Sequence, residues 1–487
     1  MSTKIIGHQV GAISSTNVSF WVGVFSSKSK DIRPTETIVE IWNMSRSKML
    51  FEIEFIKKPL RGPNNKKRYN KGWFASCNSL RPSTVYTYNI RINGKDIDPY
   101  LADGKFKTYP ERNVKQPLKI LVTSCLKAKA KTTAEKGEDR SQKVWDHINK
   151  NHNDVDITLI LGDTHYANDW RRHKKWEFTE AQFKIKDFQK HLSNTPVYAI
   201  YDDHDFIKVN SEECGAGNFA LHNKKYGPNP LRVKASLNHH GLWNVPIPIR
   251  PDGNPWRTIH EGCFQKIEYG FVDIYLLDTR YYRESRDYAD FFMRENLQRS
   301  VSLLGSNNKV VQKKKGNYRV NSEGVRIGNI QWNWIEWEFG NYKKLPDGDK
   351  RVKIICLGST MCDGTDRLMP TSKNQNYKYE LKKLGSILKG HKNVIFCSGD
   401  MHRLEYNLLP KQYFDVDPQA REIMSSGIGR TTNREKSQLV GGYAILELFQ
   451  DQENEIKVKF YQPSGENERH NRKYKVPPNQ IIKLKGY

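Results

Sequence analysis

The chain has 487 residues, enough for two or three compact domains, and with 37% hydrophobic and 11% aromatic residues it is too apolar for a disordered protein. Lys and Arg outnumber Asp and Glu by 80 to 54, so the formal net charge of +26 favours anionic partners such as nucleic acid or an anionic surface. A basic surface that is merely solvated explains the charge equally well.

The N-terminal stretch lacks the apolar core of a secretory signal, and no apolar run is long enough for a membrane span. The sequence therefore predicts a cytoplasmic protein. The seven cysteines have neither the density of a disulfide scaffold nor the spacing of a zinc ribbon, so most are expected to be reduced.

Residues 1–112 are predicted to form a small β-sandwich domain. Short stretches of alternating hydrophobicity occur at 18–25, 37–42 and 85–92, and Gly, Pro, Ser and Asn separate them. A polar piece with two prolines, 109–117, predicts a linker. Residues 113–487 are predicted to form a second domain.

Six apolar runs in this second domain predict strands buried on both faces, typical of a layered α/β fold. Amphipathic stretches at 141–152 and 327–339 predict helices on the sheet, and 442–450 and 454–463 predict an antiparallel pair that closes the domain. Ligands in α/β folds bind beyond the carboxyl ends of strands, and each run ends in polar residues. The six runs are 117–125, 156–163, 196–205, 272–280, 351–360 and 393–402.

Two basic segments, 171–180 and 285–324, fit neither pattern. Long polar loops are common at protein surfaces, so both are predicted to be surface insertions, or else excursions beside the mouth of the site.

Asp163, at the end of one run, could bridge two cations, although an Asp that bonds its own backbone in a turn is common after Gly. Asp203 and His204 lie among further carboxylates in YDDHDF, where bound cations would offset the repulsion. Asp203 is predicted to bind metal and His204 to face the substrate. An exposed acidic loop is the alternative.

Asp400 and His402 stand two residues apart, so in an extended segment both side chains could hold one cation; a structural histidine is the alternative. Cys125 could bind a metal as thiolate or be a small core residue. Arg280 could hold phosphate oxygens or pair with a neighbouring carboxylate.

The motifs SCL, GDTHY, PVYAIYDDHDF, LLDTRYYR and GDMH, in this order, resemble the alkaline phosphatase D (PhoD-like) family of metallophosphoesterases. The stretches 7–22, 80–95 and 106–110 resemble its fibronectin-like N-terminal domain. The resemblance implies an α/β fold, a four-layer αββα sandwich preceded by a small all-β fibronectin-like sandwich. It also implies hydrolysis of phosphomonoesters or phosphodiesters.

The resemblance further implies a centre with two or more metal ions, calcium and iron among them. It places a tyrosinate upstream of the DDH element, where 177–189 offers Phe178 and Phe183 but no Tyr. That departure argues against iron and keeps zinc, manganese and magnesium as alternatives. The implied metal ligands are Cys125, Asp163, Asp203, Asp400 and His402; His204 and Arg280 are implied to act on the phosphate, and Asn210 and Tyr166 are additional candidates.

Two other functions remain open. A nuclease would use the positive charge, including Lys313, Lys314 and Lys315, to bind nucleic-acid phosphates. A catalytically inactive relative would serve as a binding protein through its basic surface and would retain little metal.

Overall fold

The computed structural model describes residues 4–25, 37–56, 70–92, 95–96, 103–128, 137–167, 172–206, 222–223, 227–228, 230–243, 245–281, 329–342, 344, 350–361, 375–429, 442–463 and 477–485. The segment 285–324, with its lysine cluster, and the candidate ligand Asn210 lie outside these ranges.

The N-terminal part consists of two antiparallel sheets, as the alternating stretches predict. Phe20 of the first sheet contacts Tyr88 and Phe106 of the second, with ring centroids 4.8 and 5.7 Å apart, so the two sheets pack face to face. The first sheet has the order β1 (Lys4–Ile13), β2 (Val18–Phe25), β5 (Asn70–Cys77). The second has the order β4 (Met49–Glu54), β3 (Thr37–Asn43), β6 (Val85–Ile92), β7 (Lys95–Asp96), with β8 (Asp103–Lys107) also paired to β6.

Two six-stranded mixed sheets form the rest of the core, and all six predicted buried strands are confirmed. One sheet runs β11 (Val197–Ile200), β10 (Ile157–Leu161), β9 (Leu118–Thr123), β20 (Tyr443–Leu448), β21 (Glu455–Tyr461), β22 (Gln480–Lys483). The other runs β14 (Gln265–Tyr269), β15 (Val272–Leu276), β16 (Val352–Ser359), β17 (Val394–Gly399), β19 (Arg421–Ser425), β18 (Leu404–Leu408). The strands β20 and β21 pair antiparallel as predicted.

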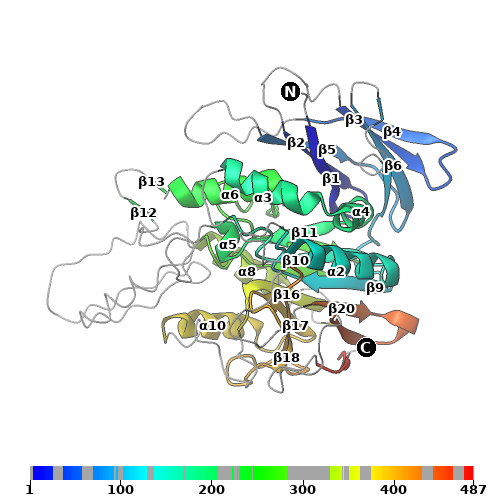
Figure 1. The fold of residues 1–487 in the computed structure, drawn as a ribbon. Coiled ribbons are helices and arrows are strands. Elements are labelled where there is room, and N and C mark those ends of the chain that lie inside the picture. Colours follow the sequence, from blue (N-terminus) through cyan, green and yellow to red (C-terminus); the bar gives the residue numbers. More distant parts are fainter. Residues whose placement is uncertain are drawn as a thin grey trace.

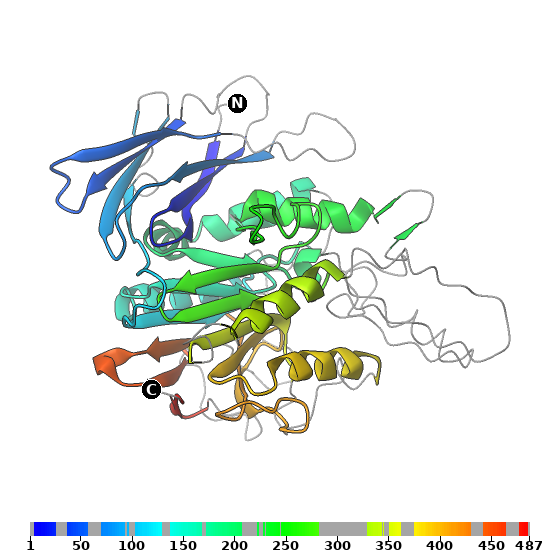
Figure 2. The ribbon, with the colours of Figure 1, turned by 180° about the vertical axis from the view of Figure 1, so that it is seen from behind.

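Helices cover the outer face of each sheet, which gives the predicted four-layer αββα arrangement. On the first sheet lie α2 (Gly137–Asn151) and α4 (Lys186–Asn194), whose Trp145 and Phe188 rings are 4.7 Å apart. On the second lie α8 (Asn329–Tyr342) and α10 (Gln375–Leu388), and Phe339 of α8 packs on Tyr275 of β15. Figures 1 and 2 show α2 and α8 on opposite sides of the paired sheets.

The prediction that residues 171–180 form a surface insertion or a loop at the site is wrong. Residues 172–180 belong to α3 (Arg172–Phe183), a helix that packs apolar side chains inward, and Arg171 lies outside the described ranges. Trp176 is only 2% exposed and stacks on Trp21 of β2, with ring centroids 6.1 Å apart. Because the helix begins with several basic residues, the sequence pattern does not indicate that one of its sides is apolar.

The N-terminal sandwich is held to the α/β part by hydrogen bonds as well as by this apolar contact. The Trp21 indole donates to the Gly241 carbonyl at the end of α6 (Pro230–Leu242), 2.9 Å away. The Tyr88 hydroxyl donates to the Ser193 carbonyl of α4 at 2.8 Å. The sandwich therefore rests on α3, α4 and α6 (Figure 1).

Four short elements complete the described fold: α5 (Asp203–Phe206), β12 (His222–Asn223), β13 (Gly227–Pro228) and the 3-10 helix η3 (Gln450–Gln452). The cysteines in the described ranges are buried and have free thiols, in line with the prediction that most are reduced. They are Cys77, Cys125, Cys263, Cys356 and Cys397. Within the same ranges, no helix combines the length and the apolar character needed to cross a membrane.

Candidate metal centre

Loops at the carboxyl ends of both large sheets bring the predicted ligands together. Cys125 follows β9, Asp163 follows β10, and Asp203 begins the short helix after β11. Asp400 and His402 follow β17 of the other sheet. The site therefore lies where the ends of the two packed sheets meet, which is why ligands nearly 280 residues apart in the chain can be neighbours.

Three groups of side chains in the described ranges offer ligand atoms within 4.8 Å of one another. Asp163 belongs to two of these groups, and so does Asp203, which makes the three groups one continuous cluster. The shared carboxylates have the arrangement expected of ligands that bridge neighbouring cations. The groups are Cys125, Asp163 and His402; Asp163, Asp203 and His204; and Asp202, Asp203 and Asp400.

The glycine before each of two candidate ligands permits a close approach of the backbone. A Cβ at Gly162, which precedes Asp163, would lie 2.4 Å from the Asp202 Cβ, and the φ of Gly162 is +85°. A Cβ at Gly399, which precedes Asp400, would lie 2.4 Å from the Leu161 carbonyl oxygen. Glycine at these positions lets the strand ends of both sheets converge.

Four candidate ligands have the left-handed backbone conformation that non-glycine residues rarely adopt. The φ angles are 62° at Cys125, 52° at Asp163, 75° at Asp400 and 55° at His402. Each such residue costs free energy that the surrounding structure must supply, and strain of this kind concentrates at functional sites. This backbone conformation directs the four side chains into the same cluster.

The cluster concentrates negative charge in a buried space. Burial raises the pKa of Asp163 well above its ordinary value, and the carboxylates of Asp203, Asp202, Asp205 and Asp400 raise it further. Burial likewise raises the pKa of the Cys125 thiol, with added repulsion from Asp163 and Asp400. Bound cations would remove both penalties, so the donor set fits a metal centre.

Tyr166 supplies a phenol at the same place. Its hydroxyl lies 3.1 Å from Nε2 of His402, and its ring packs on His204 with centroids 4.1 Å apart. Tyr166 lies on the loop after β10, three residues beyond Asp163. A tyrosine thus reaches the cluster from a loop other than 177–189, and the identity of the metals stays a prediction.

Arg280, after β15, pairs with a carboxylate, which is one of the two roles that the sequence left open. Its Nε donates to Asp202, and its Nη2 donates to the Ser359 hydroxyl at 2.9 Å. Burial alone would lower the pKa of Arg280, but the carboxylates of Asp202 and Asp203 raise it, so the guanidinium remains charged. Arg280 offsets part of the negative charge of the cluster.

The remaining carboxylate of the YDDHDF motif has a structural role. Asp205 accepts hydrogen bonds from the backbone N–H of Thr164 at 3.0 Å and of His165 at 3.1 Å, and from the Thr164 hydroxyl at 2.7 Å. These contacts tie the loop of Asp163 to the short helix of Asp203. Burial raises the pKa of Asp205 to about 6 in spite of these donors.

Ser426 was not identified from the sequence. It follows β19 and is fully buried; its hydroxyl donates to the Cys125 sulfur at 3.1 Å and accepts the backbone N–H of His402 at 3.0 Å. One side chain thereby contacts two candidate ligands from different sheets. A lone serine in the stretch MSSGIG carries no signal that would distinguish it from other small residues.

Comparisons with known proteins identify a family and proteins of similar fold. The PhoD-like phosphatase family matches residues 120–476. A solved structure of PhoD is 14% identical, with a TM-score of 0.59, and the match covers 98% of this chain and 88% of that one. A purple acid phosphatase from yellow lupin (Lupinus luteus) seeds is 12% identical, with a TM-score of 0.58, over 99% of this chain and 74% of that one. No curated protein sequence matches.

Proposed function

The chain belongs to the PhoD-like phosphatase family, and on that basis we propose that it hydrolyses phosphomonoesters or phosphodiesters with water at a centre of two or more metal ions. The observation that carries the proposal is the continuous cluster of ligand groups that share Asp163 and Asp203. A shared carboxylate is the feature by which a two-metal site holds its ions close enough to act on one phosphate.

When bound, the metal ions would polarise the phosphoryl oxygens and make a bound water acidic near neutral pH. Asp163 and Asp203 would bridge ions, with Cys125, Asp400 and His402 as further ligands and the Tyr166 phenol as an additional one. A ring nitrogen of His204 lies within 4.8 Å of carboxylate oxygens of Asp163 and Asp203, so a phosphate bound by the ions would lie near this imidazole. There its imidazole would stabilise charge that develops on the phosphoryl oxygens.

Arg280 acts in this proposal as a positioning residue. Its contact with Asp202 holds that carboxylate at the edge of the cluster, beside Asp203 and Asp400. Its positive charge also reduces the repulsion among these carboxylates. The mixed donor set fits more than one kind of ion: thiolate, phenol and imidazole suit iron or zinc, whereas carboxylates suit calcium, magnesium or manganese.

Replacement of Asp163 by Asn tests the proposal. Asparagine keeps the size of the side chain and tolerates the φ of 52° at this position, so the fold should survive while the bridging charge is lost. We expect hydrolysis of a chromogenic phosphodiester and phosphomonoester to fall at least about a thousandfold, of the order seen when a central electrostatic group is removed.

The matched control is Asp154→Asn, since Asp154 pairs with Lys119 at the surface, away from the cluster, and its side chain is 60% exposed. This variant should keep wild-type hydrolysis and metal content. Full hydrolysis by Asp163→Asn, with circular dichroism unchanged, would contradict the proposal.

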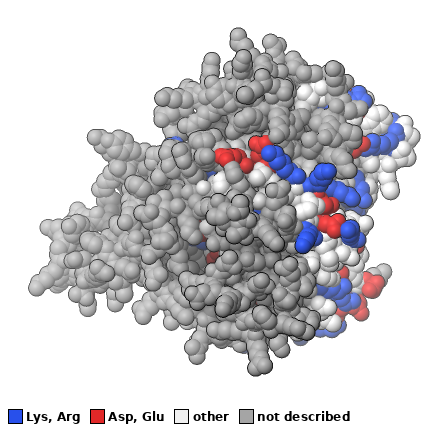
Figure 3. Space-filling model, viewed as in Figure 1, with Lys and Arg blue, Asp and Glu red and all other residues white. Residues whose placement is uncertain are grey.

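The nuclease and the inactive binding protein remain as alternatives. Figure 3 shows Lys and Arg interspersed with Asp and Glu over the described part of one face, rather than gathered into a patch of one sign. This mixed pattern gives nucleic acid no special support. Binding to DNA or RNA that weakens steeply with salt would favour a nuclease, and a purified protein without metal would favour an inactive relative.

A further inference from the structure

A cleft of about 730 Å³ lies between the N-terminal sandwich and the α/β part. The turn between β1 and β2, the helix α8 and the stretch 246–249 line it. Lys266 and Glu268 of β14, which pair with Tyr275 and Asp273 of β15, also line it. None of the candidate metal ligands is among the residues that line the cleft, so the cleft is a separate place on the molecule.

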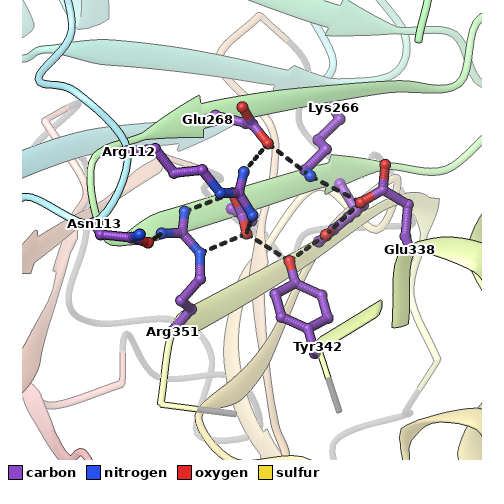
Figure 4. Close-up of polar contacts among 9 residues, drawn as sticks. Arg112, Asn113, Lys266, Glu268, Glu338, Tyr342 and Arg351 are labelled. Carbon is purple, nitrogen blue, oxygen red and sulfur yellow. Dashed lines mark hydrogen bonds and ion pairs between the residues drawn. The ribbon is translucent and has the colours of Figure 1, made fainter. Parts of the chain in front are cut away.

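Residues that line the cleft belong to a closed ring of polar contacts (Figure 4). Arg112 contacts the carboxylates of Glu268 and Asp273, and Lys266 contacts those of Glu268 and Glu338, at 2.8 Å each. The hydroxyls of Tyr275 and Tyr342 close the ring from Glu338 back to Asp273. The ring thus contains two cations, Arg112 and Lys266, and both line the cleft.

Glu268 is the member of this ring that can be replaced at least cost. Its side chain is 46% exposed, whereas Glu338 is 8% and Asp273 0% exposed. If Glu268 turned into solvent, Arg112 would keep Asp273 and Lys266 would keep Glu338 as partners. Ion pairs that reach solvent contribute less to stability than buried ones, so the loss of Glu268 would cost the fold less than the loss of Glu338 or Asp273.

Asp273, the buried carboxylate of the ring, has other partners besides Arg112. Arg351 donates to both oxygens of Asp273 at 2.8 Å, and the Tyr342 hydroxyl donates at 2.5 Å. Arg112 lies farther away, 3.7 Å from Asp273. The guanidinium of Arg112 and the ammonium of Lys266 are therefore available to share another anion in the position of Glu268.

The wall beside these cations is apolar and aromatic. Trp337 of α8 is partly exposed in the cleft, and Ile247 and Pro248 line it together with Ile13 and Val18 at the β1–β2 turn. A flat apolar body would fit against such a wall, while its anionic end reached the two cations.

We propose that this cleft is a second ligand site, which binds an organic anion whose carboxylate or phosphate group bridges Arg112 and Lys266 in place of Glu268 and whose apolar body packs on Trp337. The site is independent of the proposed phosphoester hydrolysis. The anionic group and the apolar body are both required, because inorganic phosphate alone would gain nothing from the apolar wall.

Isothermal titration calorimetry of the full chain with benzoate, phenylphosphonate and inorganic phosphate tests this site. Glu268→Gln removes the competing carboxylate at an exposed position, so both aromatic probes should bind at least about tenfold more tightly than to the wild type. Arg112→Gln removes one of the two cations and should weaken binding by a similar factor. Glu336→Gln, also on a 47% exposed carboxylate but on the Lys383 side of α8, should change nothing.

Three results would overturn the proposal. One is the absence of saturable binding of either aromatic probe to Glu268→Gln. Another is binding of both probes that neither Glu268→Gln nor Arg112→Gln alters, which would place them elsewhere, for instance at the metal centre. The third is inorganic phosphate binding to Glu268→Gln as tightly as phenylphosphonate does. Benzoate and phenylphosphonate, compared in Glu268→Gln, distinguish a carboxylate from a phosphate ligand.

Discussion

Ser426 contacts the side chain of one candidate ligand and the backbone of another. Its hydroxyl donates to Cys125 and accepts from His402, both of which have left-handed φ angles. Groups that hold metal ligands in orientation contribute to metal affinity although they do not touch the metal. Removal of this hydroxyl should therefore loosen two ligands at once.

Ser426→Ala is expected to lower metal affinity by about ten- to a hundredfold, the usual effect of losing a group that orients ligands. Competition with a coloured chelator would measure this directly. Ser425→Ala is the matched control, because the neighbouring Ser425 is equally buried but donates to the Val122 carbonyl at 2.7 Å. Equal metal affinities of the two variants would contradict a specific role for Ser426, and Ser426→Thr, which keeps the hydroxyl, should retain most of the affinity.

The residues brought together at the centre were largely predictable, because each stands at the end of a run of apolar residues that could only be a buried strand. Asp163 and Asp400 each follow a glycine, and this Gly-Asp dipeptide marks the end of each of the two strands. Contacts across the two sheets, such as that of Ser426 with Cys125, depend on packing that no short motif records. The sequence also could not decide whether Arg280 binds phosphate or pairs with a carboxylate, because its partner Asp202 follows another strand.

At the scale of elements, strands were easier to predict than helices. Strands such as β10 and β17 are buried at every position and consist mostly of apolar residues, so their pattern can be recognised without knowledge of their neighbours. The helix α3 instead begins with charged residues, and even Lys175 is only 1% exposed. Its inward side is recognisable only when the surface that it covers, around Trp21, is known.

Trp176→Ala should therefore destabilise the protein by about 3 to 5 kcal/mol, the cost of a large cavity in an apolar interface. Urea unfolding followed by circular dichroism would measure it. Lys184→Ala, at a 58% exposed position just after α3, should change stability by less than about 1 kcal/mol. A Trp176→Ala variant as stable as Lys184→Ala would restore the interpretation of this segment as a surface insertion.

At the scale of the whole molecule, the predicted boundary between residues 1–112 and 113–487 lies in a stretch without helix or strand, but the two parts share a buried interface. Tyr198 of β11 bonds Ile13 at the end of β1, with 2.9 Å between the phenol oxygen and the backbone nitrogen. Phe183 of α3 packs so closely on β1 that a side chain at Gly7 would meet it at 2.2 Å. These contacts make the sandwich a cover for an apolar surface of the α/β part.

A chain of residues 113–487 alone should consequently be less stable than the full chain. Trp176, Phe183 and Tyr198, each at most 3% exposed, would lose their cover, and fully exposing such side chains costs roughly 1.5 to 3 kcal/mol apiece. We expect the full chain to unfold in urea in one transition, and the shortened chain to unfold at lower urea and to bind a dye for apolar surfaces. If the shortened chain unfolded at the same urea concentration with the same metal content, residues 1–112 would be an independent domain whose contacts contribute nothing to the stability of the metal centre.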